Sequence, residues 1–168
     1  QHLTPRVRPG QVLMHTSGRH GLAVLAPMVR AGARAIAFHP AMTFTGTEVD
    51  LGRTCAFGLT ALPADRRLAE MLVSELGGVP EWIDEADRTR YHAALSHGAN
   101  HLNPLVSQAM DVLRAAGVDD PSAVLRPLLT ASLDNALAYG DAAVTGPVAR
   151  GDVNTVRAHT ETLAVQPE

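Results

Sequence analysis

The sequence contains no lysine: all 14 basic residues among its 168 are arginine. No side-chain amine of this chain can therefore act as an acid, a base or a Schiff-base nucleophile. A single cysteine, Cys55, excludes a disulfide within the chain, which fits a cytoplasmic protein. Cys55 lies in an alternating apolar stretch, and this favours a small core residue over a nucleophile.

Strong positive charge and long apolar runs are also missing. The net charge is −3, whereas a protein that binds nucleic acid needs a basic patch to meet the phosphates. Pro27 and Arg30 interrupt the most apolar segment, so no stretch is long enough to span a membrane. With 46% hydrophobic residues, the chain can form one substantial core or two small ones.

The first half of the chain alternates between strand and helix patterns. Residues 11–15 and 33–38 read as buried strands, and the helical spacing over 21–31 between them implies a parallel unit. After a polar loop, residues 54–59 predict a third strand and residues 63–76 an amphipathic helix. Residues 80–83 resemble a connector without regular structure.

From there the pattern becomes entirely helical. Asp84 can cap a long helix that reaches residue 116, with a bend where Pro104 removes a backbone hydrogen bond. Two further helices are predicted, over residues 121–139 and 152–163. We therefore expect an α/β domain over residues 1–80, containing part of a Rossmann-like parallel sheet, followed by an all-α domain over residues 81–168.

The α/β part supplies only about half of a doubly wound sheet, whose open edge another segment would have to complete. The chain also starts at Gln1 without an initiator methionine or a targeting pattern. Both features suggest a fragment.

Three polar side chains fall on one face of the long helix. His92, Ser96 and Asn100 are spaced at i, i+4 and i+8, so they stack within about 80° of one another. A buried polar group without a partner costs about 1–3 kcal/mol, and a packed helix face therefore rarely carries three without a function. The alternative is that Ser96 and Asn100 bond nearby backbone and that the histidine has no catalytic role.

Polar turns follow the first two predicted strands. Thr16, Ser17 and Gly18 follow one strand, and His39 and Pro40 follow the other. Open α/β sheets bind ligands where parallel strands end. These turns thus predict the rim of a cleft, although the hydroxyl groups could instead only cap the following helix.

A glycine- and proline-framed loop, residues 145–152, joins two predicted helices. Its rigidity would position Arg150 for bidentate binding of a carboxylate. In the alternative interpretation the loop is a linker, in which Asp152 caps the next helix and pairs with Arg150.

Other patterns are weaker. His97 and His101 have the i, i+4 spacing of a helical metal pair, but no glutamate follows His97 as in zinc proteases. They also point away from the His92 face, so no metal site is predicted. Ser17 lacks the framing of a hydrolase nucleophile elbow, and none of the 14 glycines forms a Gly-x-Gly-x-x-Gly dinucleotide fingerprint.

Taken together, the blocks 39–44, 91–100 and 145–152 resemble one family in order and spacing. It is the group of Rossmann-like proteins with a helical C-terminal domain of unknown function 2520, similar to 6-phosphogluconate and β-hydroxyacid dehydrogenases. The chain departs from it at the front, where the first βαβ unit with the phosphate-binding glycines is missing.

The resemblance implies an oxidoreductase that uses NADP (NADPH), similar to an alternative class of ketopantoate reductases. In ordinary ketopantoate reductases the matching helix carries a lysine and two asparagines, at the positions that His92, Ser96 and Asn100 occupy here. The residues implied to line the nicotinamide end are Thr16, Ser17, Gly18, His39 and Pro40, and those implied to approach the substrate are Thr43, Thr145, Arg150 and Asp152.

The resulting hypothesis is reduction of a 2-keto acid, with ketopantoate as the first candidate. His92 would protonate the developing alkoxide, because a histidine can donate a proton close to neutral pH. Asn100 would orient the carbonyl and Arg150 would hold the carboxylate. The main alternative is a non-catalytic helical domain that forms a homodimer, with activity belonging to a longer polypeptide; a histidine-ligated metallohydrolase is the third.

Overall fold

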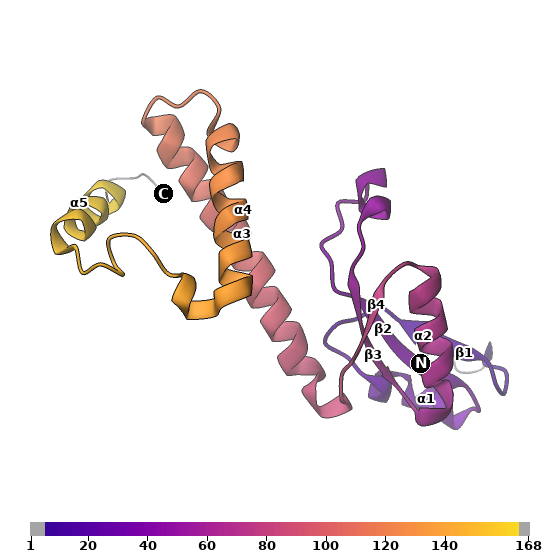
Figure 1. Cartoon of the computed structure of the whole chain (residues 1–168). Coiled ribbons are helices and arrows are strands. Elements are labelled where there is room, and N and C mark those ends of the chain that lie inside the picture. The colour runs from indigo at the N-terminus through magenta and orange to yellow at the C-terminus, as the bar shows by residue number, and fades with distance from the viewer. Residues whose placement is uncertain (1–5, 165–168) are drawn as a thin grey trace. The chain divides into compact units, whose positions relative to one another are not determined.

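The computed structural model describes residues 6–164, which divide into two compact units between His101 and Leu102. This division lies inside one long helix, α3, which runs from Arg88 to Ala115 and continues through Pro104 without a break. Each unit is described in turn. Figure 1 labels the elements.

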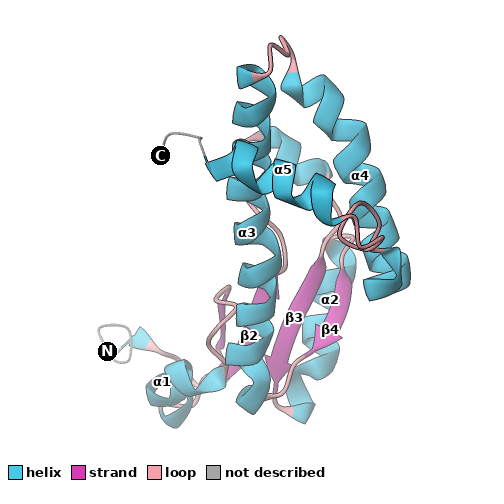
Figure 2. Cartoon of the chain, turned by 90° about the vertical axis from the view of Figure 1, so that its left-hand side faces the viewer, coloured by secondary structure: helices cyan, strands magenta, loops and turns pink. Residues whose placement is uncertain are grey.

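The first unit is built on a four-stranded sheet with the order β1-β2-β3-β4. Figure 2 labels β2, β3 and β4 of this sheet. Its strands are β1 (Val12–His15), β2 (Arg34–Pro40), β3 (Ala56–Ala61) and β4 (Val79–Trp82). The connecting helices are η2 (Leu22–Leu25), α1 (Ala26–Arg30), η3 (Glu48–Gly52), η4 (Pro63–Asp65), α2 (Arg66–Glu75) and η5 (Glu85–Asp87).

The sheet is mostly parallel. β1 pairs with β2, and β3 with β4, in parallel, as expected for a Rossmann-like fold. The sheet is not parallel between β2 and β3, which pair antiparallel with His39 opposite Gly58. The reason lies in the connection between them, which holds only the short η3, whereas a parallel pair needs a longer crossover that usually contains an α-helix.

Two expectations about this unit are corrected. The segment expected as a connector is strand β4, an outer strand of the sheet, where Pro80 is tolerated because an edge strand can lack a ladder donor. The long helix also starts later than expected. Asp84 makes no capping side-chain hydrogen bond, a 3-10 turn follows it, and α3 begins at Arg88.

Alternation along β2 divides the core between the two faces of the sheet. Ile36 and Phe38 belong to the cluster that contains Ala69 and Val73 of α2. Ala35 belongs to a second cluster, which contains the residues Leu25, Met28 and Ala33. Because successive side chains of a strand point to opposite faces, β2 is buried on both sides and fixes where its last residues, His39 and Pro40, emerge.

The second unit is entirely helical in its described part, as predicted. It contains the end of α3, then α4 (Pro121–Tyr139), η6 (Gly140–Ala143) and α5 (Val153–Ala164). The Asp120 carboxylate accepts the backbone N–H groups of Ser122 and Ala123 at 3.0 and 3.1 Å, which caps α4. None of the described helices has the length and apolar character needed to cross a membrane.

Candidate active site

The turns after β1 and β2 meet at one edge of the sheet. The two strands are parallel, so their carboxyl ends lie side by side. Gly18 of the first turn is buried, and a Cβ atom added to it would lie 2.9 Å from Nε2 of His39 and 2.5 Å from Cδ2 of His92. Both imidazole rings thus press against the bare backbone of this turn, where glycine leaves the required room.

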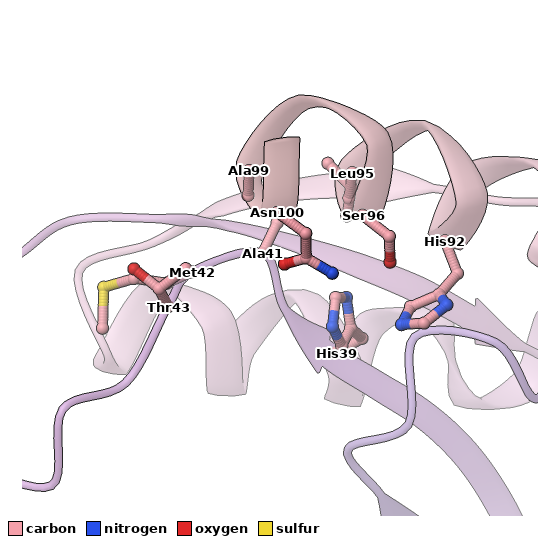
Figure 3. Close-up of a pocket in the computed structure, with 9 residues that line it drawn as sticks. All are labelled: His39, Ala41, Met42, Thr43, His92, Leu95, Ser96, Ala99 and Asn100. Carbon is pink, nitrogen blue, oxygen red and sulfur yellow. The ribbon is translucent and has the colours of Figure 1, made fainter. Parts of the chain in front are cut away.

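A pocket of about 240 Å³ opens beside the two rings. It is lined from β2 and the loop after it by His39, Ala41, Met42 and Thr43, and from α3 by His92, Leu95, Ser96, Ala99 and Asn100. Figure 3 shows His39, His92, Ser96 and Asn100 gathered together, with Met42 and Thr43 to one side. The structure therefore brings together His39, Thr43 and all three polar residues predicted on the helix face.

The helix face is less buried than the sequence suggested. His92 and Ser96 are half-buried, and Asn100 is exposed. The helical spacing does place the three side chains on one side, but that side lines an open pocket rather than packing into a core. Asn100 is exposed to water, so of the three residues it bears the smallest free-energy cost of burying a polar group.

His39 is held by a neighbour from α3. The Tyr91 hydroxyl lies 2.9 Å from Nδ1 of His39, and the rings of His39 and His92 meet edge to face with centroids 6.2 Å apart. Burial lowers the pKa of His39 most strongly, followed by the positive charge of Arg88 and then by His92. His39 is accordingly biased toward its neutral form.

Arg88 is a buried cation beneath the site, 1% exposed. Its guanidinium donates to three backbone carbonyls: those of Ser17 at 2.9 Å, His20 at 3.0 Å and Gly58 at 3.0 Å. It ties the turn after β1 to β3, and no ion pair neutralises it among the described residues. In the sequence, one signal could have pointed to Arg88 as part of the site: it precedes His92 by four residues and so shares its helix face.

With this geometry established, comparison with known proteins identifies the family. Residues 55–168 match the model of a domain of unknown function, DUF2520, and residues 2–40 match a Rossmann-like domain. The chain belongs to the DUF2520 family. A comparison with curated protein sequences gave no significant match.

Solved structures agree with the fold of this DUF2520 chain. Protein BF3122 from Bacteroides fragilis, a candidate NADP oxidoreductase, superposes with a TM-score of 0.75 at 24% identity, over 93% of this chain and 59% of that one. Protein TM1727 from Thermotoga maritima superposes with a TM-score of 0.66 at 24% identity, over 88% of this chain and 58% of that one. A reductive aminase from Aspergillus terreus, solved with NADPH and ethyl levulinate, superposes with a TM-score of 0.51 at 17% identity, over 76% of this chain and 46% of that one.

At such identities these similarities establish the fold. The DUF2520 chain also spans less than two thirds of the length of each of these proteins.

The remaining residues of the two turns have mixed roles. Thr16 is exposed, and Pro40 ends β2 opposite Phe57. The Ser17 hydroxyl accepts the backbone N–H of His20 at 3.3 Å, so it closes the turn rather than capping a helix. His15 uses both ring nitrogens: Nδ1 accepts from the Ser17 backbone at 3.3 Å, and Nε2 therefore donates to the Gly21 carbonyl at 2.8 Å.

Three residues expected at the substrate belong to the second unit: Thr145, Arg150 and Asp152. Asp152 caps α5, because its carboxylate accepts the backbone N–H of Thr155 at 3.1 Å and the Thr155 hydroxyl at 2.7 Å. This matches one half of the linker interpretation. The other half is not observed, since no ion pair between described residues joins Arg150 to Asp152.

The structure also shows the surroundings of the candidate metal pair, His97 and His101, and of Cys55. Among the described residues, no group of three or more His, Cys, Asp or Glu side chains could hold a metal ion. His97 and His101 are exposed and contact each other, with ring centroids 4.6 Å apart. Burial raises the pKa of the Cys55 thiol, which packs against the core and is less reactive for it.

Proposed function

We propose that this protein is part of an NADPH-dependent reductase of small 2-keto acids. The observation that carries the proposal is the convergence of His39 and His92 on one pocket, at the edge where the parallel strands β1 and β2 end. Open α/β sheets bind ligands at this edge. The fold shared with a candidate NADP oxidoreductase and with an NADPH-bound reductive aminase supports the choice of cofactor.

The residues present fit one end of such a cofactor. The turn Thr16–Gly18 has no side chain at Gly18, where His39 of β2 and His92 lie against it, and both histidines line the pocket. The pocket of about 240 Å³ is smaller than the roughly 300–1,000 Å³ of sites that enclose a whole ligand, so it suits a single ring or a small acid. When bound, reduced nicotinamide supplies a hydride.

The side chains of α3 would act on the substrate. His92 would protonate the oxygen of the reduced carbonyl, while Ser96 and Asn100 would orient that carbonyl by hydrogen bonds. Thr43 would contact the acid from the rim of the pocket. We assign the carboxylate to Arg150, aided by Thr145, because the Arg150 guanidinium makes no hydrogen bond or ion pair within the described residues.

The substrate we propose first is a ketopantoate-like branched 2-keto acid. Leu95, Ala99 and Met42 give the pocket an apolar wall beside its polar groups. Such a wall suits a branched aliphatic chain attached to the keto acid. A comparison of 2-keto acids of increasing branching would test this choice.

The decisive test uses His92→Ala in the complete gene product. Loss of a general acid should lower kcat by about 10²–10⁴-fold and leave NADPH affinity, measured by fluorescence titration, nearly unchanged. His97→Ala is the matched control, since His97 is an exposed histidine of the same helix and should change neither quantity. Unchanged turnover in His92→Ala would remove His92 from the mechanism, and absence of NADPH binding would refute the reductase.

A second proposal, formation of a homodimer by the helical unit, rests on exposed apolar side chains. Large hydrophobic residues that are at least 43% exposed include Leu102, Leu105, Val124, Leu128, Leu133, Leu137, Val148 and Leu163. A surface of this kind is typical of protein interfaces. Light scattering at micromolar concentration tests the proposal, and a strict monomer would contradict it.

A further inference from the structure

The hydrogen bond between His39 and Tyr91 defines which nitrogen of His39 carries a proton. The Tyr91 oxygen also lies against Gly58 of β3, whose backbone N–H acts to lower the pKa of the phenol. The hydroxyl can donate its own proton to Nδ1 of His39, 2.9 Å away, and imidazole nitrogen is a good acceptor for it. A neutral imidazole has one acceptor and one donor nitrogen, so when Tyr91 donates to Nδ1 the proton of His39 is on Nε2.

The Nε2 atom of His39 lies beside the turn at Gly18, 2.9 Å from the position that a Cβ atom would take there. No hydrogen bond among the described residues uses it, and none of their buried side-chain nitrogen or oxygen atoms lacks a partner. Nε2 must therefore reach solvent, and the open space lined by His39 is the pocket that Ser96 and Asn100 also line. His39 thus presents a free N–H donor where a ligand would bind.

The surroundings of His39 disfavour a second proton on its ring. The charged or titratable groups beside it, Arg88, Tyr91 and His92, all come from α3. Arg88 keeps its charge at every physiological pH and has no carboxylate partner among the described ion pairs. Burial raises the pKa of Tyr91 and outweighs the opposing effect of Arg88, so the phenol also stays neutral.

We propose that His39 is the hydrogen-bond donor that polarises the substrate carbonyl, and that Tyr91 is a positioning residue that fixes its tautomer. The inference rests on the proposed reductase function. Neutral Nε2–H would stabilise the negative charge that develops on the carbonyl oxygen and would keep its own proton. The proton that completes the hydroxyl group would come from His92, so the two histidines have separate roles.

The tautomer is tested on this chain alone, without cofactor. Nitrogen-15 NMR at neutral pH should show Nδ1 of His39 unprotonated and Nε2 protonated. Tyr91→Phe should shift His39 toward a mixture of tautomers. Tyr139→Phe should not, because Tyr139, the only other tyrosine of the chain, is 68% exposed. A charged His39, or one with its proton on Nδ1 in the wild type, would overturn the inference.

The role in turnover is tested in the complete gene product with a branched 2-keto acid and NADPH. Removal of a carbonyl-oxygen donor by His39→Ala should lower kcat by about 10²–10³-fold with little change in NADPH affinity. His39→Gln, which restores an N–H donor, should recover part of the loss. Tyr91→Phe should lower kcat less than His39→Ala, and Tyr139→Phe should leave it unchanged.

The outcomes separate this inference from the proposed function. If His39→Ala weakens NADPH binding but keeps kcat, His39 only lines the cofactor site and this inference fails alone. If the wild-type protein reduces no 2-keto acid, the proposed function fails, and the role of His39 in reduction falls with it whatever its tautomer.

Discussion

The sheet unit and the helical unit bury their apolar side chains to very different degrees. In the sheet unit Ile36, Leu59 and Val73 are 0% exposed. In the described part of the helical unit only Pro121 and Leu125 are buried, and Leu137 is 79% exposed. The histidines of the pocket belong to the densely packed unit. The geometry of the site therefore depends on two core clusters whose residues all belong to the sheet unit.

Truncation of one leucine in each unit should give the largest difference in the free energy of unfolding between the two units. Leu59→Ala removes a fully buried side chain and should lower the free energy of unfolding by about 2–5 kcal/mol. Leu137→Ala should change it by no more than about 0.5 kcal/mol, because most of that side chain is in water. Urea unfolding followed by circular dichroism measures both. An equal loss in Leu137→Ala would mean that another molecule covers this face in solution.

A glycine substitution tests whether the positions of the two histidines matter for turnover. Gly18→Ala should lower turnover of the complete gene product by up to about 10²-fold, because the new Cβ would collide with His92 and His39 and displace both rings. Gly98→Ala is the control. Nothing lies within 4 Å of its Cβ position in the middle of α3, so this variant should gain about 0.5–1 kcal/mol of stability and keep its activity. Full activity in Gly18→Ala would show that the rings need not hold their positions.

The smallest expected effect is a pH dependence confined to the sheet unit. Since the pKa of His39 is lower in the folded chain than in the unfolded one, the unfolded chain binds more protons between these two values. Stability should therefore fall as the pH drops below about 6.5, the value for an unperturbed histidine. His39→Gln should flatten that part of the profile. Identical slopes for the wild type and His39→Gln would contradict the shift.

Local signals in the sequence were enough for most elements. Helix α4 was predicted over its observed length. The structure shows that its boundaries are local, because Asp120 caps its start, Pro121 is its first residue and Gly140 ends it. The face shared by His92, Ser96 and Asn100 followed in the same way from helical spacing.

The features that sequence reasoning missed depend on distant contacts. β4 was hidden because Pro80 and its exposed neighbours show no alternation, and only pairing with β3 makes the segment a strand. Arg88 was missed because arginine is rarely buried, and the carbonyls that satisfy it come from residues 30 to 71 positions away. Nothing local to α3 indicates that these carbonyls are there.

The buried guanidinium of Arg88 also determines how the site can be regulated. Acetylation, which switches off many lysine-dependent sites, has no side chain to modify in this chain, and a guanidinium does not lose its charge at any pH the protein would meet in a cell. The positive field beneath the pocket is therefore constant. In the described lining of the pocket only His39 and His92 have ionisable side chains, so a change in its charge must come from one of these two residues.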